Sequence, residues 1–356
     1  MMRPSYLFGF LFGLIFLLGT SASYGGEEAV EIGDDAPEGY LDSITWIKEL
    51  YDGGPTIADT PVVLEFWATF DSGSKRAIPE LTELQAKYGQ DQLTVLSVTW
   101  PVEGQTDSDI KRFVQRQGKR MNFWVGIDEE GGKASKELFE SSTVPVPFAF
   151  IIGREGRLQF LGHPTSDKFT EVLEKVVLGR YDHKSFEKAK RHLQEVKRAR
   201  SLKNWDQYYK LSNDVLEIDR RIFYTIYIER FDVELMDRNN PQKAYADAQA
   251  LIVERADDPE MLGWLGLHIA TDPSIPDEKR NLDVALQLTK AARLTGGMRK
   301  PMLMALEARV LLERGEIAEA VALQRDAYRT ASTGRKEAYK RVYQEYRSQL
   351  KRTQAE

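Results

Sequence analysis

The most informative absence in this 356-residue chain is cysteine, of which it has none. Without a thiol the chain can form no disulfide bond, no thiolate metal site and no cysteine nucleophile. Histidine is also scarce: four occur in the whole chain, and none form a pair at the spacing of a helical zinc motif. We therefore expect no metal and no cofactor.

A basic excess is absent as well. Lys and Arg number 49 against 55 Asp and Glu, which gives a formal net charge of −6. A protein whose main partner is nucleic acid needs a clear surplus of cations to neutralise phosphates. The charge balance argues against that class of partner, while 42% hydrophobic and 29% charged residues are typical of a folded globular protein.

Long hydrophobic runs are confined to the N-terminus. Arg3 precedes an apolar stretch over residues 6–18, and small residues follow at 19–23. This order is typical of a secretory signal, and the run is shorter than the ~20 residues that a membrane-spanning helix needs. We expect residues 1–25 to be a signal peptide cleaved near Ala22, which predicts an exported, periplasmic or cell-envelope protein. Membrane contact is expected only if this segment stays uncleaved.

Strand and helix signals alternate from about residue 61 to residue 178. Short apolar runs predict strands buried on both faces, and apolar residues at helical spacing predict helices between them. Such alternation indicates an α/β layered domain, here ending in an antiparallel hairpin. Strands are predicted at 62–68, 93–99, 123–127, 148–152 and 157–161, and helices at 107–116, at 168–178 and in a stretch ending near Tyr88.

Only helical signals follow this region. Ala244, Ala285 and Ala320 begin three similar small-residue patterns, spaced 41 and 35 residues apart. The last unit, in a helix–turn–helix frame, resembles a tetratricopeptide repeat, whose period is about 34 residues. We expect two or three stacked helical hairpins.

A charged helix is expected between the two regions, over residues 185–203. Its basic residues are usually a solvated face, and binding to anionic lipid headgroups is the weaker alternative. These residues are Lys188, Lys190, Arg191, Lys197, Arg198 and Arg200.

Residues 62–80 read VVLEFWATFDSGSKRAIPE. This segment resembles the thioredoxin superfamily, in its exported TlpA/ResA-like (redoxin) branch. The pattern of that branch is FWATWC-x-x-C followed by a helix with an early proline, and residues 66–69 and Pro79 match it. The resemblance covers roughly residues 29–182. It implies a thioredoxin-like domain, a central mixed sheet flanked by helices, followed here by an all-α helical-hairpin domain. The predicted layout is then a thioredoxin-like domain at 29–182, a basic helical linker at 183–204 and an α-helical repeat-like domain at 205–352.

The sequence departs from that family at its two cysteine positions, which are Asp71 and Ser74. Thiol–disulfide exchange needs one thiolate to attack sulfur and a second thiol to resolve the mixed disulfide. A carboxylate and a serine hydroxyl can do neither, and no cysteine elsewhere can replace them. We expect no thiol–disulfide oxidoreductase activity, so a family label of oxidoreductase would lack chemical support.

Asp71 and Glu65 are the two residues near the former cysteine positions that could act as an acid or a base. Asp71 is expected to cap the following helix, with an acid or base role as the weaker alternative. Glu65 matches the family's buried acid, and burial should raise its pKa. Its two interpretations are a carboxyl satisfied within the fold, which we favour, and a general acid or base.

Pro147 matches the family's cis-proline. By resemblance, the Val146–Pro147 bond should be cis and the backbone of Val146 should offer an edge to an extended peptide. Trp67 and Phe70 would line that groove, although both could equally be core or cover residues. Asp71, Ser74, Val146 and Pro147 complete the expected binding residues. These residues favour a redox-inactive binding or scaffold protein that engages protein or peptide partners through the groove and the helical repeats. The alternative is a non-thiol enzyme that uses Glu65 and Asp71.

Overall fold

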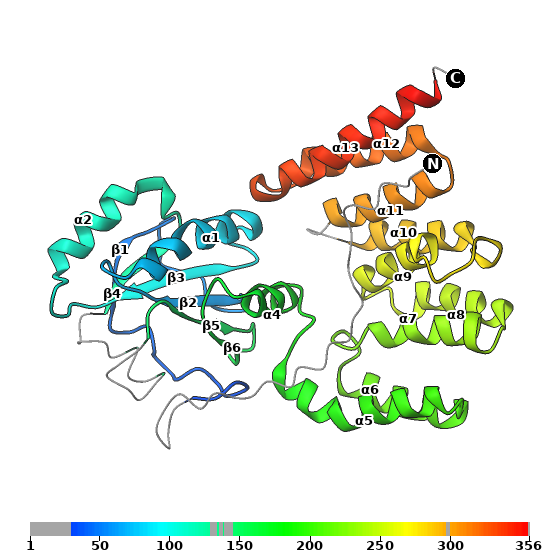
Figure 1. Cartoon of the computed structure of the whole chain (residues 1–356), viewed down its shortest axis with the longest axis horizontal. Helices are drawn as coiled ribbons and strands as arrows, with labels where there is room; N and C mark the ends of the chain where they lie inside the picture. Colours follow the sequence, from blue (N-terminus) through cyan, green and yellow to red (C-terminus); the bar gives the residue numbers. More distant parts are fainter. Residues whose placement is uncertain (1–29, 129–133, 135–137, 139–144, 297–299, 355–356) are drawn as a thin grey trace.

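The structure, a computed structural model, describes residues 30–128, 134, 138, 145–296 and 300–354. It has an α/β part that ends with α4 (Asp167–Val177) and an all-helical part that begins with α5 (His183–Ser201), as Figure 1 shows. The predicted fold class, a thioredoxin-like α/β domain followed by helices, is confirmed. The predicted signal peptide lies outside the described residues.

A six-stranded sheet in the order β1-β4-β3-β2-β5-β6 forms the centre of the described α/β part. β2, β3 and β4 are parallel neighbours, whereas β1, β5 and β6 run antiparallel to the strands beside them. The strands are β1 (Ile44–Lys48), β2 (Val62–Phe66), β3 (Thr94–Thr99), β4 (Trp124–Asp128), β5 (Phe148–Ile152) and β6 (Leu158–Gly162). All five predicted strands are therefore confirmed, and β1 is an additional edge strand.

Both faces of the sheet are covered. Successive residues of a strand point to opposite faces, so Val63 and Val95 pack with helices on one face. Leu64 and Leu96 pack on the other, against apolar side chains that precede β2. The helices on the first face are α1 (Ser72–Tyr88), α2 (Asp107–Gln117) and α4, and a short 3-10 helix, η1 (Gly118–Arg120), follows α2. The position of α1 matters most for function, because its first turn lies at the end of β2.

The helical part is a stack of helical hairpins (Figure 1). Its elements are α5, α6 (Trp205–Asp219), α7 (Thr225–Asp232), the π-helix η2 (Val233–Asp237), α8 (Pro241–Glu254), α9 (Pro259–Thr271), the 3-10 helix η3 (Asp277–Lys279), α10 (Leu282–Thr295), α11 (Lys300–Glu313), α12 (Ile317–Thr330) and α13 (Thr333–Thr353). Neighbouring helices pack along the chain order, as in α5 with α6, α9 with α10 and α11 with α12.

The predicted linker at 183–204 is instead the first helix of this stack. Ala189, Leu193 and Val196 of α5 are buried and form one apolar cluster with Tyr208 and Leu211 of α6. The basic side chains of α5 occupy the remaining face. An amphipathic helix that buries an apolar stripe belongs to a core, so the linker prediction is wrong.

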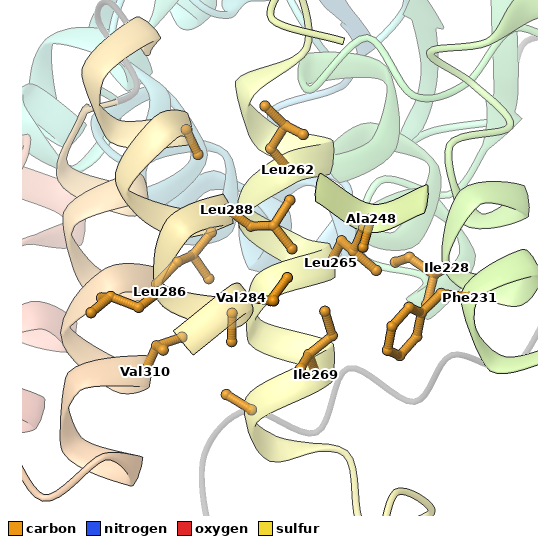
Figure 2. Packing of buried hydrophobic residues seen from close by; sticks show 14 of the residues in the cluster. Ile228, Phe231, Ala248, Leu262, Leu265, Ile269, Val284, Leu286, Leu288 and Val310 are labelled. Carbon is orange, nitrogen blue, oxygen red and sulfur yellow. The ribbon is translucent and has the colours of Figure 1, made fainter. Parts of the chain in front are cut away.

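The alanines that set the predicted rhythm are packing positions. Ala244, Ala285 and Ala320 are completely buried, in α8, α10 and α12. Figure 2 shows Leu265 of α9 directed at neighbouring helices within the same cluster. α9 and α10 approach closely at Gly266, where a Cβ atom would lie 2.7 Å from the carbonyl oxygen of Ala285. Small residues therefore let these helices pack, while the tetratricopeptide likeness stays a prediction.

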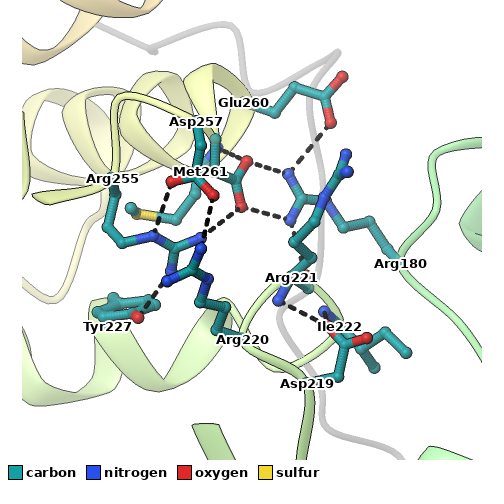
Figure 3. Close-up of polar contacts among 11 residues, drawn as sticks. Arg180, Asp219, Arg220, Arg221, Ile222, Tyr227, Arg255, Asp257, Glu260 and Met261 are labelled. Carbon is teal, nitrogen blue, oxygen red and sulfur yellow. Dashed lines mark hydrogen bonds and ion pairs between the residues drawn. The ribbon is translucent and has the colours of Figure 1, made fainter. Parts of the chain in front are cut away.

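Arg180 joins the two parts of the chain. It follows α4, yet its side chain is only 3% exposed and lies among helices of the second part (Figure 3). Nη1 donates to the carbonyl oxygen of Arg221 at 2.7 Å and to Asp258 Oδ2 at 2.7 Å, and Nη2 donates to Asp258 Oδ1 and, at 3.1 Å, to Glu260. The rings of Tyr224 and Trp264 flank the guanidinium at 4.8 and 5.2 Å. Arg180 is thus held by both ion pairs and aromatic faces.

A second contact joins α13, the last helix of the stack, to the C-terminal end of α1. The hydroxyl of Ser332 donates to the carbonyl oxygen of Lys87 at 3.2 Å. The guanidinium of Arg335 lies 5.0 Å from the centre of the Tyr88 ring. Gly334 packs directly on the backbone of α1, since a Cβ atom there would lie 2.5 Å from Lys87 Cα. The helical part therefore contacts the α/β part at two places, through Arg180 and through the start of α13.

We predict that Arg180→Ala lowers the free energy of unfolding by about 3–5 kcal/mol, because it removes the buried guanidinium that binds the carboxylates of both Asp258 and Glu260. Urea unfolding followed by circular dichroism measures this loss.

Arg220→Ala is the matched control. Arg220 also pairs with an aspartate, Asp257, at 3.1 Å, but both side chains are about half exposed, at 57% and 47%. An exposed pair contributes about 0–1 kcal/mol. Equal losses in the two variants would contradict the role of Arg180.

Candidate functional site

Asp71 and Ser74 form a hydrogen-bonded pair at the start of α1. Asp71 is the N-cap, and its Oδ1 accepts from the backbone N–H of Ser74 at 2.6 Å and from the Ser74 hydroxyl at 2.9 Å. The backbone N–H of Ala68 donates to the same hydroxyl at 3.3 Å. The expected capping role is confirmed, and such a cap contributes about 1 kcal/mol. Ser74 is 1% exposed, so its hydroxyl is not presented to a ligand.

Pro147 lies against this first turn. The Val146–Pro147 peptide bond is cis, as the resemblance implied. A Cβ atom on Gly73 would lie 2.7 Å from Pro147 Cδ and 3.1 Å from Asp71 Oδ1, so only glycine fits between the proline ring and the capping carboxylate. The structure thus brings Asp71, Ser74 and Pro147 together, with Asp71 partly exposed and both Ser74 and Pro147 buried, so the prediction that these two residues contact a ligand is not supported. Within the described residues the backbone of Val146 forms no hydrogen bond.

The two aromatic residues of the motif differ in exposure. Phe70, directly before Asp71, is 58% exposed, whereas Trp67 is 2% exposed. The Trp67 ring packs on Phe113 of α2, with ring centres 5.4 Å apart, inside the core cluster. The prediction that Trp67 lines a groove is therefore wrong, and its alternative role as a core residue is correct. Phe70 remains available to a partner.

Gln105 braces the loop that carries Phe70. Its amide oxygen accepts from the backbone N–H of Thr69 at 2.5 Å, and its amide nitrogen donates to Thr99 and to the carbonyl oxygen of Trp100, both at 2.9 Å. The side chain is 1% exposed, so these bonds are made away from water. Val102, in the same loop as Gln105, is 42% exposed. Nothing in the sequence pattern singled out Gln105, because its partners lie in other segments.

Glu65 is buried in the centre of the sheet. It is 1% exposed and lies opposite Ser97 of β3, whose hydroxyl donates to Glu65 Oε2 at 2.6 Å. Oε1 has no hydrogen-bond partner among the residues that the structure describes. Burial raises the pKa of Glu65 to about 8; the Ser97 hydrogen bond opposes this rise and the charge of Asp71 adds to it. The expected rise is confirmed, and Glu65 is mostly protonated at neutral pH.

His163 is held by a local contact. It lies in the turn after β6, where the Thr165 backbone N–H donates to its Nδ1 at 3.3 Å. Across the described ranges no group of three His, Asp or Glu side chains could hold a metal ion. None of the described helices is both long and apolar enough to cross a bilayer. The groups that the candidate site presents are an exposed aromatic ring, backbone polar groups and the capped N-terminus of a helix.

The sequence matches no family model and no curated protein. Among solved structures, an oxidised thioredoxin-like protein is similar at 22% identity over 41% of this chain and 99% of its own, with a TM-score of 0.33. A putative thiol:disulfide interchange protein DsbE from Chlorobium tepidum is similar at 21% identity over 42% and 98%, with a TM-score of 0.32. StoA from Bacillus subtilis is similar at 17% identity over 32% and 83%, with a TM-score of 0.28.

The α/β part has a thioredoxin-like fold, with a mixed sheet, flanking helices and a cis-proline beside the first turn of α1. It differs from a thiol enzyme in the two residues of that turn, because the whole chain lacks cysteine. The fold is therefore combined with a site that has no sulfur chemistry.

We predict that Glu65→Gln changes the pH dependence of stability. The folded-state pKa of Glu65, about 8, lies above the ordinary value of 4.5. The unfolded chain therefore releases this proton first, and the wild type loses stability as the pH rises from about 4.5 to about 8. The glutamine variant lacks this loss, so its advantage over the wild type should grow by roughly 5 kcal/mol across this range, since each pKa unit corresponds to about 1.4 kcal/mol.

Urea unfolding across that pH range measures the difference between the two proteins. Ser97→Ala provides the second variant: it removes the hydrogen bond that lowers the pKa of Glu65, so the loss should continue to higher pH than in the wild type. Parallel stability curves for wild type and Glu65→Gln would show that Glu65 is not held protonated by burial.

Proposed function

We propose that this chain is a redox-inactive, thioredoxin-like binding protein of the cell envelope that holds an extended peptide segment of a protein partner. The observation that carries the proposal is the Asp71–Ser74 pair, in which a carboxylate and a hydroxyl are joined by a 2.9 Å hydrogen bond where the family resemblance implies thiols. The cis Val146–Pro147 bond remains beside the pair. A site that retains the thioredoxin-like backbone arrangement but lacks the reactive sulfur atoms is better suited to binding a ligand than to catalysing a reaction.

The surface around the pair supports a peptide as the ligand. Phe70 and Val102 are large apolar side chains that are 58% and 42% exposed. Exposed apolar groups next to polar backbone are the two elements of recognition by strand addition, in which main-chain hydrogen bonds give affinity and side-chain contacts give specificity. The backbone of Val146 supplies the main-chain element and Phe70 the side-chain element.

The non-thiol enzyme is the less supported candidate. The raised pKa of Glu65, about 8, would suit a general acid. Its carboxyl is only 1% exposed in the centre of the sheet, so a substrate has no direct approach to it. Asp71 Oδ1 is occupied by two hydrogen bonds within α1. Both groups are thus explained by their roles in the fold.

The helical part supplies a second docking surface in this proposal, since stacked helical hairpins present extended faces to protein partners. Placement in the envelope follows from the N-terminal pattern of a basic residue, a short apolar run and small residues. The two parts then act as one body, because Arg180 and the contact of α13 with α1 connect them.

A photoreactive phenylalanine analogue tests the proposal. Placed at Phe70 in the full chain and irradiated in cells, it should yield a discrete crosslinked protein. Placed at Leu294, which is 78% exposed in α10, it should not yield that species. Position 294 is matched in apolar character and exposure but lies outside the candidate site.

A second variant connects the crosslink to the groove. Gly73→Val places a side chain where Pro147 now packs, so it should displace the cis-proline loop and strongly reduce the crosslink at position 70. Circular dichroism of the purified variant verifies that it is folded. The absence of a crosslink at 70, or the same product from 294, would contradict the proposal.

A further inference from the structure

The last helix carries a local excess of positive charge. α13 contains seven Lys and Arg residues and two Glu, a net charge of +5 in 21 residues, although the whole chain has −6. The remaining 335 residues therefore carry −11. α13 is the outermost helix of the stack in Figure 1, packed against α12 and, at its N-terminal end, against α1.

The basic residues of α13 fall into two groups. Those near its N-terminus are engaged: Arg335 lies over Tyr88, Lys336 over Tyr328, and Lys340 pairs with Glu337 at 3.1 Å. The other four basic residues, from Arg341 onward, are exposed and form no ion pair with any residue in the described ranges. These are Arg341, Arg347, Lys351 and Arg352.

The four free cations share one face of the helix. At 3.6 residues per turn they lie within an arc of about 140°, over an axial length of about 16 Å. The opposite face holds Tyr346, which is 4% exposed and packs in the helical core. None of the large apolar side chains that are exposed in the described structure lies on α13. Contact through this face is therefore electrostatic.

In the other basic helix, α5, three of the seven Lys and Arg side chains form ion pairs within the protein. Lys190 pairs with Glu187 at 3.1 Å and Arg191 with Glu195 at 3.0 Å. Arg200 pairs with Asp237 at 2.9 Å. The charged stretch that the sequence marked as an alternative lipid contact is thus partly engaged within the protein, which makes α5 the comparison helix for the test below.

We propose that the outer face of α13 binds the anionic headgroups of a phospholipid surface. Basic side chains spaced along a straight helix can each contact a different headgroup, and such contacts add up over a negatively charged surface. The expected export of the chain brings it to a membrane. α13 packs at the C-terminal end of α1, whereas Phe70 precedes the N-terminal end of that 17-residue helix, about 25 Å away. The outer face of α13 and the Phe70 site are thus separate places on the protein, and this proposal stands independently of peptide binding.

Co-sedimentation of the full chain with vesicles tests the proposal. At low salt the wild type should partition into phosphatidylglycerol vesicles at least about tenfold more strongly than into phosphatidylcholine vesicles. A variant without the four free cations should lose this preference. Its substitutions are Arg341→Gln, Arg347→Gln, Lys351→Gln and Arg352→Gln.

The control removes the same formal charge from α5 and should keep the preference. Its substitutions are Lys188→Gln, Lys190→Gln, Arg191→Gln and Arg198→Gln. All three proteins share the N-terminal apolar segment, so its contribution cancels in the comparison. The proposal is overturned by a wild type without preference for phosphatidylglycerol, by a preference that survives in the α13 variant, or by equal losses in both variants. Binding of the α13 face to polyglutamate without a lipid preference would indicate an acidic protein partner and would also overturn it.

Discussion

A single carboxylate oxygen organises the candidate site. Asp71 Oδ1 accepts two hydrogen bonds from Ser74, one from its backbone and one from its hydroxyl, and these bonds begin α1. The turn so formed brings Gly73 against Pro147, with no space for a side chain between them. In a thiol enzyme of this fold the same turn would hold the reacting atoms. Here the turn is held by hydrogen bonds to the Asp71 carboxylate, and Phe70 is the exposed side chain next to it.

The helical part restrains α1 from outside. Arg180 connects the segment after α4 to the start of α9 through carboxylates that are buried with it, and Gly334 places α13, the last helix of the stack, on the backbone of α1. The two contacts differ physically, because the first depends on charge in a buried setting and the second on the close approach of two backbones. Together they hold the C-terminal end of α1 in a defined position relative to the helical part.

Much of this architecture could be predicted from local patterns. Strands buried on both faces have continuous apolar runs, and the cap and the cis-proline have fixed places in the thioredoxin-like pattern, so β2 to β6, Asp71 and Pro147 were predicted correctly. β1 was not, because this partly exposed edge strand has no continuous apolar run. α5 was misassigned as a linker because its many charges conceal an apolar stripe at helical spacing.

The contacts that connect distant segments could not be predicted from sequence. Arg180 meets Asp258 and Glu260 across 78 and 80 residues, and Gln105 reaches the backbone of Thr69 across 36. No local periodicity encodes such pairs. The different exposures of Trp67 and Phe70 could not be predicted either: the two residues are close in sequence, yet Trp67 lies in the core and Phe70 at the surface.

The most direct test of a thioredoxin-like site without redox function is the reduction of insulin disulfides by dithiothreitol, followed as turbidity. The purified, metal-free wild type should leave the rate at the uncatalysed background, because thiol–disulfide exchange requires a thiolate that this chain does not have. The Asp71→Cys, Ser74→Cys double variant should accelerate the reaction, since the turn that holds these two positions is otherwise intact. Catalytic turnover by the wild-type chain would contradict the account.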